Sequence, residues 1–153
     1  MYIDDFELQP PTRHHPIVKL LMFLSPRFRY RAFVRTLEDA PAPPAEETVE
    51  DAAVIFVHAE HGDEAAPAKL LSKFVKNVKW LANKRGAKNI VLHSFTHLSE
   101  SKAQPGFAES FLTDASARLR NAGYRVRLTP FGYSCEWDLA VHGESIAKVF
   151  KAL

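Results

Sequence analysis

The chain has 153 residues, of which 46% are hydrophobic and 25% charged, and this length and composition predict one globular domain. Its formal net charge of +2 is too small to indicate a nucleic-acid-binding protein by charge alone, and its single cysteine excludes an intramolecular disulfide framework. No apolar run approaches the ~20 residues that cross a bilayer, and the acidic N-terminus is unlike a signal peptide. We therefore expect a cytoplasmic protein with no membrane segment.

The first half of the chain is predicted to contain three strands. The apolar run Ile17–Leu24 has the length of a central strand, and Pro26 is expected to end it. In Arg27–Arg35, arginines alternate with aromatic and small side chains, which predicts a half-buried strand with a basic outer face. A loop rich in proline and acidic residues, Asp39–Asp51, leads to a second buried strand at Ala52–Glu60.

The second half is predicted to alternate helices with strands. Apolar side chains recur at helical spacing over Pro67–Lys84 and from Pro105 to Gly123. Strands are predicted at Asn89–Phe95, Tyr124–Leu128 and Cys135–His142, and a short helix at Ile146–Leu153. This order predicts an α/β or α+β fold in which mixed β-sheet layers pack against two long helices and a short C-terminal helix.

The domain boundary is expected near residue 16. Residues 1–16 are polar and contain prolines, which favours a flexible N-terminal extension. Residues 17–153 then form the single domain.

Two polar stretches follow directly on buried strands, "HAEHGDE" after Val57 and "HSFTHLSES" after Leu92. A strand end is a rigid platform that holds side chains in fixed geometry, so both stretches are candidate parts of a site. His58, His93, His97 and Cys135 are all residue types that bind metals. No stretch has a zinc-finger or HExxH spacing, so a metal site and histidines scattered at the ends of strands both stay open.

Cys135 is the only thiol in the chain. Nucleophilic catalysis needs a thiolate beside a base, and His58, His97 and His142 are the candidate bases. The alternative is a small buried apolar residue, because its neighbours alternate as in a half-buried strand.

Basic side chains gather on two predicted elements. Arginines lie on one face of the Arg27–Arg35 strand, and Lys73, Lys76 and Lys79 lie on the first helix. Such residues suit contacts to RNA phosphates, although a solvated basic face is the simpler interpretation.

Several stretches have an order and spacing that match a known family. They are "KLLMF" in the first strand, "FVHAE" in the second, "FTHLSES" after the third, Pro105 at the start of a helix, and "NAGYRVRLTPFGY", the most specific of them. Together they resemble the editing domain at the N-terminus of archaeal-type threonyl-tRNA synthetase. The resemblance covers most of Val18–Leu153, and we expect a freestanding relative of that domain.

The resemblance implies a fold like that of D-aminoacyl-tRNA deacylases and a pocket for the aminoacylated 3′ end of a tRNA. It implies hydrolysis of L-serine wrongly attached to threonine tRNA, without a cofactor, by a protein that forms homodimers. His97 and Cys135 are the implied catalytic positions. The implied substrate-binding residues are Val57, His58, Ala59, Glu60, Phe95, Phe131, Gly132, Tyr133 and Ser134.

The chain departs from the family pattern where the chemistry is expected. In "FGYSC", Ser134 replaces a second tyrosine and Cys135 replaces a lysine, and Lys148 stands where a glutamate is expected. An ammonium stabilises a developing oxyanion, whereas a neutral thiol does not. Two alternatives therefore stand beside the deacylase: a non-catalytic module that binds a ligand or a protein, and a metal-binding derivative of the pocket.

Overall fold

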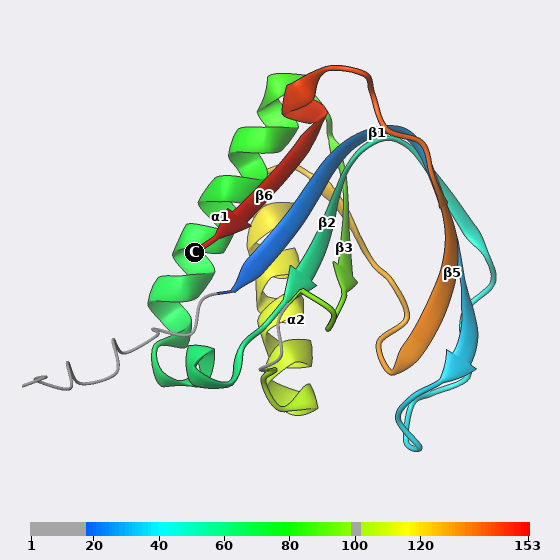
Figure 1. The fold of residues 1–153 in the computed structure, drawn as a ribbon, viewed down its shortest axis with the longest axis vertical. Helices are drawn as coiled ribbons and strands as arrows, with labels where there is room; N and C mark the ends of the chain where they lie inside the picture. Colours follow the sequence, from blue (N-terminus) through cyan, green and yellow to red (C-terminus); the bar gives the residue numbers. More distant parts are fainter. Residues whose placement is uncertain (1–17, 99–101) are drawn as a thin grey trace, which may run out of the picture.

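The protein is described by a computed structural model that covers residues 18–98 and 102–153, so the predicted extension at residues 1–16 lies outside the described residues. Its centre is a six-stranded mixed sheet in the order β4-β3-β2-β1-β5, with β6 pairing to β1 (Figure 1). The strands are β1 (Lys19–Arg35), β2 (Glu47–His58), β3 (Asn89–Ser94), β4 (Arg125–Leu128), β5 (Tyr133–Leu139) and β6 (Lys148–Ala152). β2, β3 and β4 are parallel, and the pairs that β1 makes are antiparallel.

Two long helices cover one face of this sheet, which confirms the predicted α/β class (Figure 1). They are α1 (Pro67–Lys84) and α2 (Pro105–Asn121), each with a proline in its first turn, where the missing N–H costs nothing. Their apolar faces meet the inner side chains of β1, β2 and β3 in the larger hydrophobic core. Short 3-10 turns, η1 (His61–Ala65) and η2 (Ser145–Ala147), precede α1 and β6. Within the described ranges, no helix has the length and apolarity to cross a bilayer.

The first two predicted strands are one continuous strand of 17 residues, so the expectation that Pro26 ends a strand is wrong. On the outer edge of β1, β6 pairs with Lys19–Phe23 and β5 pairs with Phe28–Arg35. Pro26 lies between these two segments, where no partner strand needs its missing N–H.

β1 and β2 bend along their length (Figure 1), and their register is interrupted at Pro26 and Asp51, between the pairs Ser25–Ala52 and Arg27–Glu50. Asp51 has a φ of 46°, in the left-handed region that aspartate tolerates better than most residues. The same sheet face holds Phe23 before the bend and Phe28 after it, so the alternation of side chains is reset there. Beyond the bend, β1, β2 and β5 arch away from the helices (Figure 1).

A second hydrophobic cluster fills the face that the helices leave open. Phe56 lies at its centre, 5.2 Å from the ring of Phe95 and 5.2 Å from the ring of Trp137. Phe28 packs against Trp137 at 6.5 Å. These aromatic side chains form the floor on which the site described below is built.

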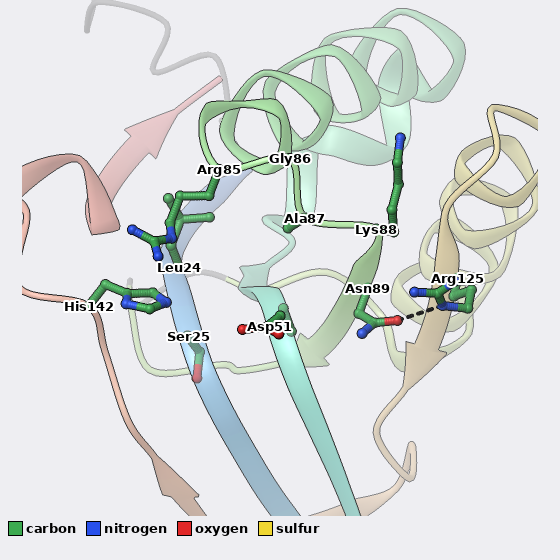
Figure 2. A pocket seen from close by; sticks show the side chains of 11 residues that line it. Leu24, Ser25, Asp51, Arg85, Gly86, Ala87, Lys88, Asn89, Arg125 and His142 are labelled. Carbon is green, nitrogen blue, oxygen red and sulfur yellow. Dashed lines mark hydrogen bonds between the residues drawn. The ribbon is translucent and has the colours of Figure 1, made fainter.

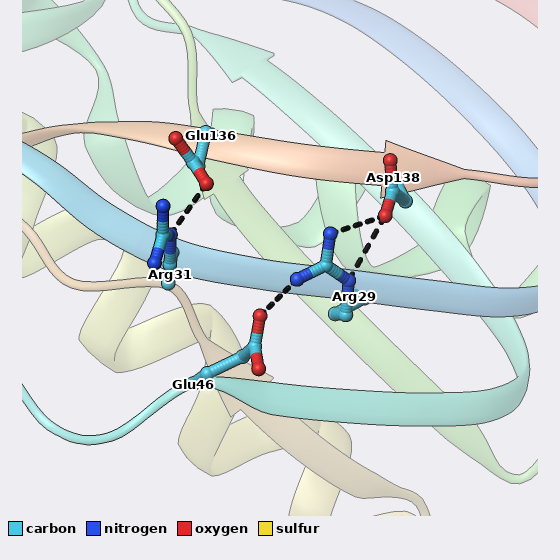
Figure 3. Close-up of polar contacts among 5 residues, drawn as sticks. All are labelled: Arg29, Arg31, Glu46, Glu136 and Asp138. Atoms are coloured by element: carbon cyan, nitrogen blue, oxygen red, sulfur yellow. Dashed lines mark hydrogen bonds and ion pairs between the residues drawn. The ribbon is translucent and has the colours of Figure 1, made fainter.

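Two arginines on the outer face of β1, Arg29 and Arg31, are paired with carboxylates of β5 and of the segment just before β2 (Figure 3). Arg29 donates to Asp138 with its Nε at 2.9 Å and also pairs with Glu46. Arg31 pairs with Glu136. On the predicted basic face, the guanidinium groups of Arg29 and Arg31 are therefore neutralised by exposed ion pairs.

The C-terminal residues form a strand, so the predicted short helix at Ile146–Leu153 is wrong. Their apolar spacing also fits a helix, but a helix of eight residues has little stability of its own. The free edge of Lys19–Phe23 offers backbone partners instead, and β6 pairs with it from Lys148 to Ala152.

Candidate functional site

A cleft of about 800 Å³ opens between the end of β3 and the segment that leads into β5. One wall is the end of β3 with the loop beyond it, and the other is Thr129–Trp137. Seven of the residues predicted from the sequence line it together: Phe95, His97, Phe131, Gly132, Tyr133, Ser134 and Cys135. His93, which the sequence analysis considered only as a metal ligand, also lines the cleft, and Lys102, Thr129 and Trp137 are among the lining residues that it did not predict.

The aromatic turn Phe131–Tyr133 is tied to the end of β1. The carbonyl oxygen of Gly132 accepts hydrogen bonds from the backbone N–H groups of Thr36 at 2.7 Å and Leu37 at 3.2 Å. The Tyr133 hydroxyl donates to the carbonyl of Pro41 at 2.5 Å, and the Arg35 guanidinium lies 5.7 Å from the centre of its ring. These contacts hold one wall of the cleft in a fixed position.

Replacement of Gly132 by alanine is expected to destabilise the protein by about 1–3 kcal/mol. Gly132 has a φ of 85°, and an added Cβ would lie 2.8 Å from the Cβ of Ala40. Gly123→Ala is a matched control, since Gly123 has a φ of 98° but nothing within 4 Å of an added Cβ. Urea denaturation measures both variants, and equal losses would contradict the steric part of the prediction.

The loop that carries His97 is fixed from behind by the end of β2. The N–H of Phe95 donates to the carbonyl of Val57 at 2.9 Å, and the N–H of Leu98 donates to Nδ1 of His58 at 3.2 Å. His97 itself is exposed, with its ring 5.0 Å from the ring of Phe95. The buried ring of His58 therefore helps to position the loop that carries the exposed His97.

Val57, His58, Ala59 and Glu60 are buried and lie behind the cleft, not among its lining residues. Glu60 pairs with Lys19 at 2.5 Å, and its N–H donates to Asp63 at 2.6 Å. Burial raises the pKa of Asp63 to about 6. These residues support the loops of the cleft through their backbone and side chains, and direct contact of theirs with a substrate stays a prediction.

His93 is a buried histidine that lines the cleft. Its Nδ1 lies 2.8 Å from the hydroxyl oxygen of Thr129, and its ring packs on Phe56 at 4.9 Å. Burial lowers the pKa of His93 to about 4, so the ring is neutral near pH 7. In the sequence, His93 directly follows the apolar residues Ile90–Leu92 of β3, and this position indicates that its side chain is buried.

Cys135 is half-buried in the cleft, and burial raises the pKa of its thiol. The thiol is therefore protonated at neutral pH, which disfavours a thiolate nucleophile. Lys102 lines the opposite wall, and among the described residues that line the cleft no other is a lysine or arginine. The part of the chain that the structure describes contains no cluster of three or more histidine, cysteine, aspartate or glutamate side chains that could hold a metal ion. The structure therefore does not bring together the candidate ligands His58, His93, His97 and Cys135 as a metal site.

A second hollow, of about 310 Å³, lies at the other ends of β3 and β4 (Figure 2). Arg85, Lys88 and Arg125 surround it, and Arg125 donates to the side chain of Asn89 at 2.8 Å. His142 also lines this hollow, far from the cleft along the strands. His142 is therefore not the base that Cys135 would need, which corrects that hypothesis.

The fold belongs to a known structural class. A solved structure described as c-Myc DNA Unwinding Element Binding Protein matches with a TM-score of 0.58 and 12% sequence identity, over 87% of this chain and 97% of that one. Its fold is that of the D-aminoacyl-tRNA deacylases, as predicted.

Within this class, the chain belongs to the family of the archaea-specific editing domain of threonyl-tRNA synthetase, whose model matches residues 18–153. A threonine–tRNA ligase of Thermococcus onnurineus is 28% identical over 89% of this chain and 22% of its own length. That of Methanosphaera stadtmanae is 29% identical over 83% of this chain and 21% of its length. The chain thus spans about a fifth of the length of these relatives.

Proposed function

We propose that the cleft binds the aminoacylated 3′ end of a tRNA and hydrolyses a wrongly attached aminoacyl ester, with seryl on threonine tRNA as the first substrate to test. The observation that carries this proposal is the convergence of His97, Tyr133 and Cys135 on one cleft. Its volume of about 800 Å³ lies within the ~300–1,000 Å³ of ligand pockets. The aromatic side chains of Phe95, Phe131 and Trp137 offer surfaces for a base and a ribose.

The reaction requires a water molecule to add to the ester carbonyl. The bond between the acyl carbon and the ribose oxygen then breaks, one proton of the water passes to the ribose oxygen and the other to solvent, and the free amino acid leaves as its carboxylate. We assign His97 to orient this water or the carbonyl, because it is the exposed imidazole of the cleft. The neutral ring of His93 keeps the inner wall uncharged, with Thr129 fixing its orientation.

A panel of charged tRNAs tests this function directly. Wild-type protein is expected to release the amino acid from at least one of them, and a panel left intact would refute the proposal. Cys135→Lys is expected to hydrolyse the same substrate about ten-fold faster, because an ammonium in the cleft stabilises the oxyanion. Cys135→Ala is the control and is expected to keep the wild-type rate, whereas loss of activity would show that the thiol is the nucleophile.

A second candidate function is a binding module without catalysis. It is favoured by the raised pKa of the thiol at Cys135, where the family pattern has a lysine. Tight binding of a non-hydrolysable seryl-adenosine analogue with no turnover of the charged tRNA would select this alternative.

Two expectations remain: a homodimer, from the family resemblance, and a cytoplasmic location, from the single cysteine. Sedimentation equilibrium tests the first, and fractionation of cells that express the protein tests the second.

A further inference from the structure

The outward face of α1 is a continuous basic stripe. Lys69, Lys73, Lys76 and Lys84 fall at intervals of four, three and eight residues, which places them on one side of the helix, opposite the buried side chains. The exposed ring of Trp80 lies within the same row, with the ammonium of Lys84 at 5.3 Å from its centre. We refer to these five residues as the α1 stripe.

No acidic side chain among residues 18–98 and 102–153 forms an ion pair with Lys69, Lys73 or Lys76 of the α1 stripe. The whole segment Pro67–Lys84 contains no aspartate or glutamate, whereas α2 carries Glu109 and Asp114 on exposed positions. Among the described residues, Lys69, Lys73 and Lys76 have no ion-pair partner, in contrast to the paired arginines of β1 in Figure 3. The α1 stripe is therefore positive surface available to a polyanion.

The stripe begins at the same end of the molecule as the cleft. The carboxyl ends of β2 and β3 and the amino ends of α1 and α2 all lie at the lower side of Figure 1. The cleft loop is joined there to the chain that leads into α1, since the N–H of Ala103 donates to the carbonyl of Ala59 at 2.9 Å. Lys102 stands at the cleft next to this bond, and Lys69 lies in the first turn of α1.

We propose that the α1 stripe binds backbone phosphates of the tRNA acceptor arm whose aminoacylated 3′ end occupies the cleft. This inference rests on the function proposed above and adds the path of the RNA beyond the cleft. From Lys69 to Lys84 the row is about 22 Å long at 1.5 Å per residue, which spans several phosphates of one strand. Lysines contact phosphates as mobile point charges, without reading the base sequence.

The test compares two triple variants that change the net charge by the same amount. The first is Lys69→Gln with Lys73→Gln and Lys76→Gln, all at exposed positions of a helix where glutamine is as favourable as lysine. The control is Lys88→Gln with Arg125→Gln and Lys148→Gln, also exposed, of which the first two line the hollow of Figure 2. Binding of full-length tRNA is measured over a range of salt concentrations, together with turnover of a seryl-adenosine ester that lacks the acceptor arm.

The stripe variant is expected to bind tRNA about ten-fold more weakly than wild type. The slope of log K for tRNA binding against log salt concentration should become shallower by about two to three, because three lysines are removed and each phosphate contact contributes ~0.7–0.9. The control variant should bind like wild type, and all three proteins should turn over the short ester equally. Equal weakening in the two variants, or loss of short-ester turnover in the stripe variant, would overturn the inference.

Failure of the two proposals is distinguishable. If wild type acts on charged tRNA while the stripe variant binds it as tightly as wild type does, only the α1 path is wrong. If the wild-type protein neither binds nor hydrolyses any charged tRNA or the short ester, the proposed function is wrong. The inference that the α1 stripe binds the acceptor arm is then wrong as well.

Discussion

Replacing His97 with alanine is expected to slow hydrolysis of the mischarged ester about 100-fold, at the lower end of what a positioned imidazole contributes. His97 is exposed, borders the cleft and stands on a loop that Phe95 and Leu98 anchor to β2. Loss of its ring removes the group assigned to orient the water or the carbonyl, while the backbone anchors stay. The rate constant should therefore fall in single-turnover measurements with saturating protein, without loss of folded structure.

His142→Ala is the matched control for that experiment. His142 lines the hollow of Figure 2, at the ends of β3 and β4 opposite the cleft. Its removal should leave the rate within about two-fold of wild type. An unchanged rate in His97→Ala, or an equal fall in both variants, would remove His97 from the assigned role.

The protein is expected to lose about 3 kcal/mol of stability as the pH falls from 6.5 to 4, through His93. Burial lowers the folded-state pKa of His93 from 6.5 to about 4, so in this window the unfolded chain binds a proton that the folded protein rejects. The contribution is fully present above pH 6.5 and is lost as the pH falls through the window. His93→Gln, which stays neutral, should flatten this part of the stability profile measured by urea denaturation.

Asp63 acts with the opposite sign and supplies an internal check. Its folded-state pKa is raised from 3.8 to about 6, so its contribution to stability is lost as the pH rises through that interval. Asp63→Asn keeps an oxygen to accept the hydrogen bond from the N–H of Glu60, and should steepen the fall of stability toward low pH. A His93→Gln profile as steep as that of wild type would show that the histidine does not titrate in this way.

The amino-acid sequence was sufficient to predict the elements whose patterns are local. Helix α1 is marked by apolar side chains at Leu70, Phe74 and Val78 and by a proline at its start, and its position was predicted to the residue. In β5, Trp137 packs against Phe56 while Glu136 pairs with Arg31, as expected of the half-buried strand predicted around Cys135. The motifs "FTHLSES" and "NAGYRVRLTPFGY" correctly indicated the family, and Phe95–His97 and Thr129–Tyr133 within them line the same cleft.

Contacts between distant segments decided what the sequence patterns left undetermined. The residues Lys148–Ala152 form a strand because β1 has a free edge beside them, and no local spacing records that edge. Pro26 continues a strand because its position falls between two partner strands. Lys102 and Cys135 line the same cleft only because the sheet brings the loop after β3 and the turn before β5 together. Side-chain periodicity encodes which residues are buried, whereas strand pairing and sheet curvature, which are non-local, determine which of them meet.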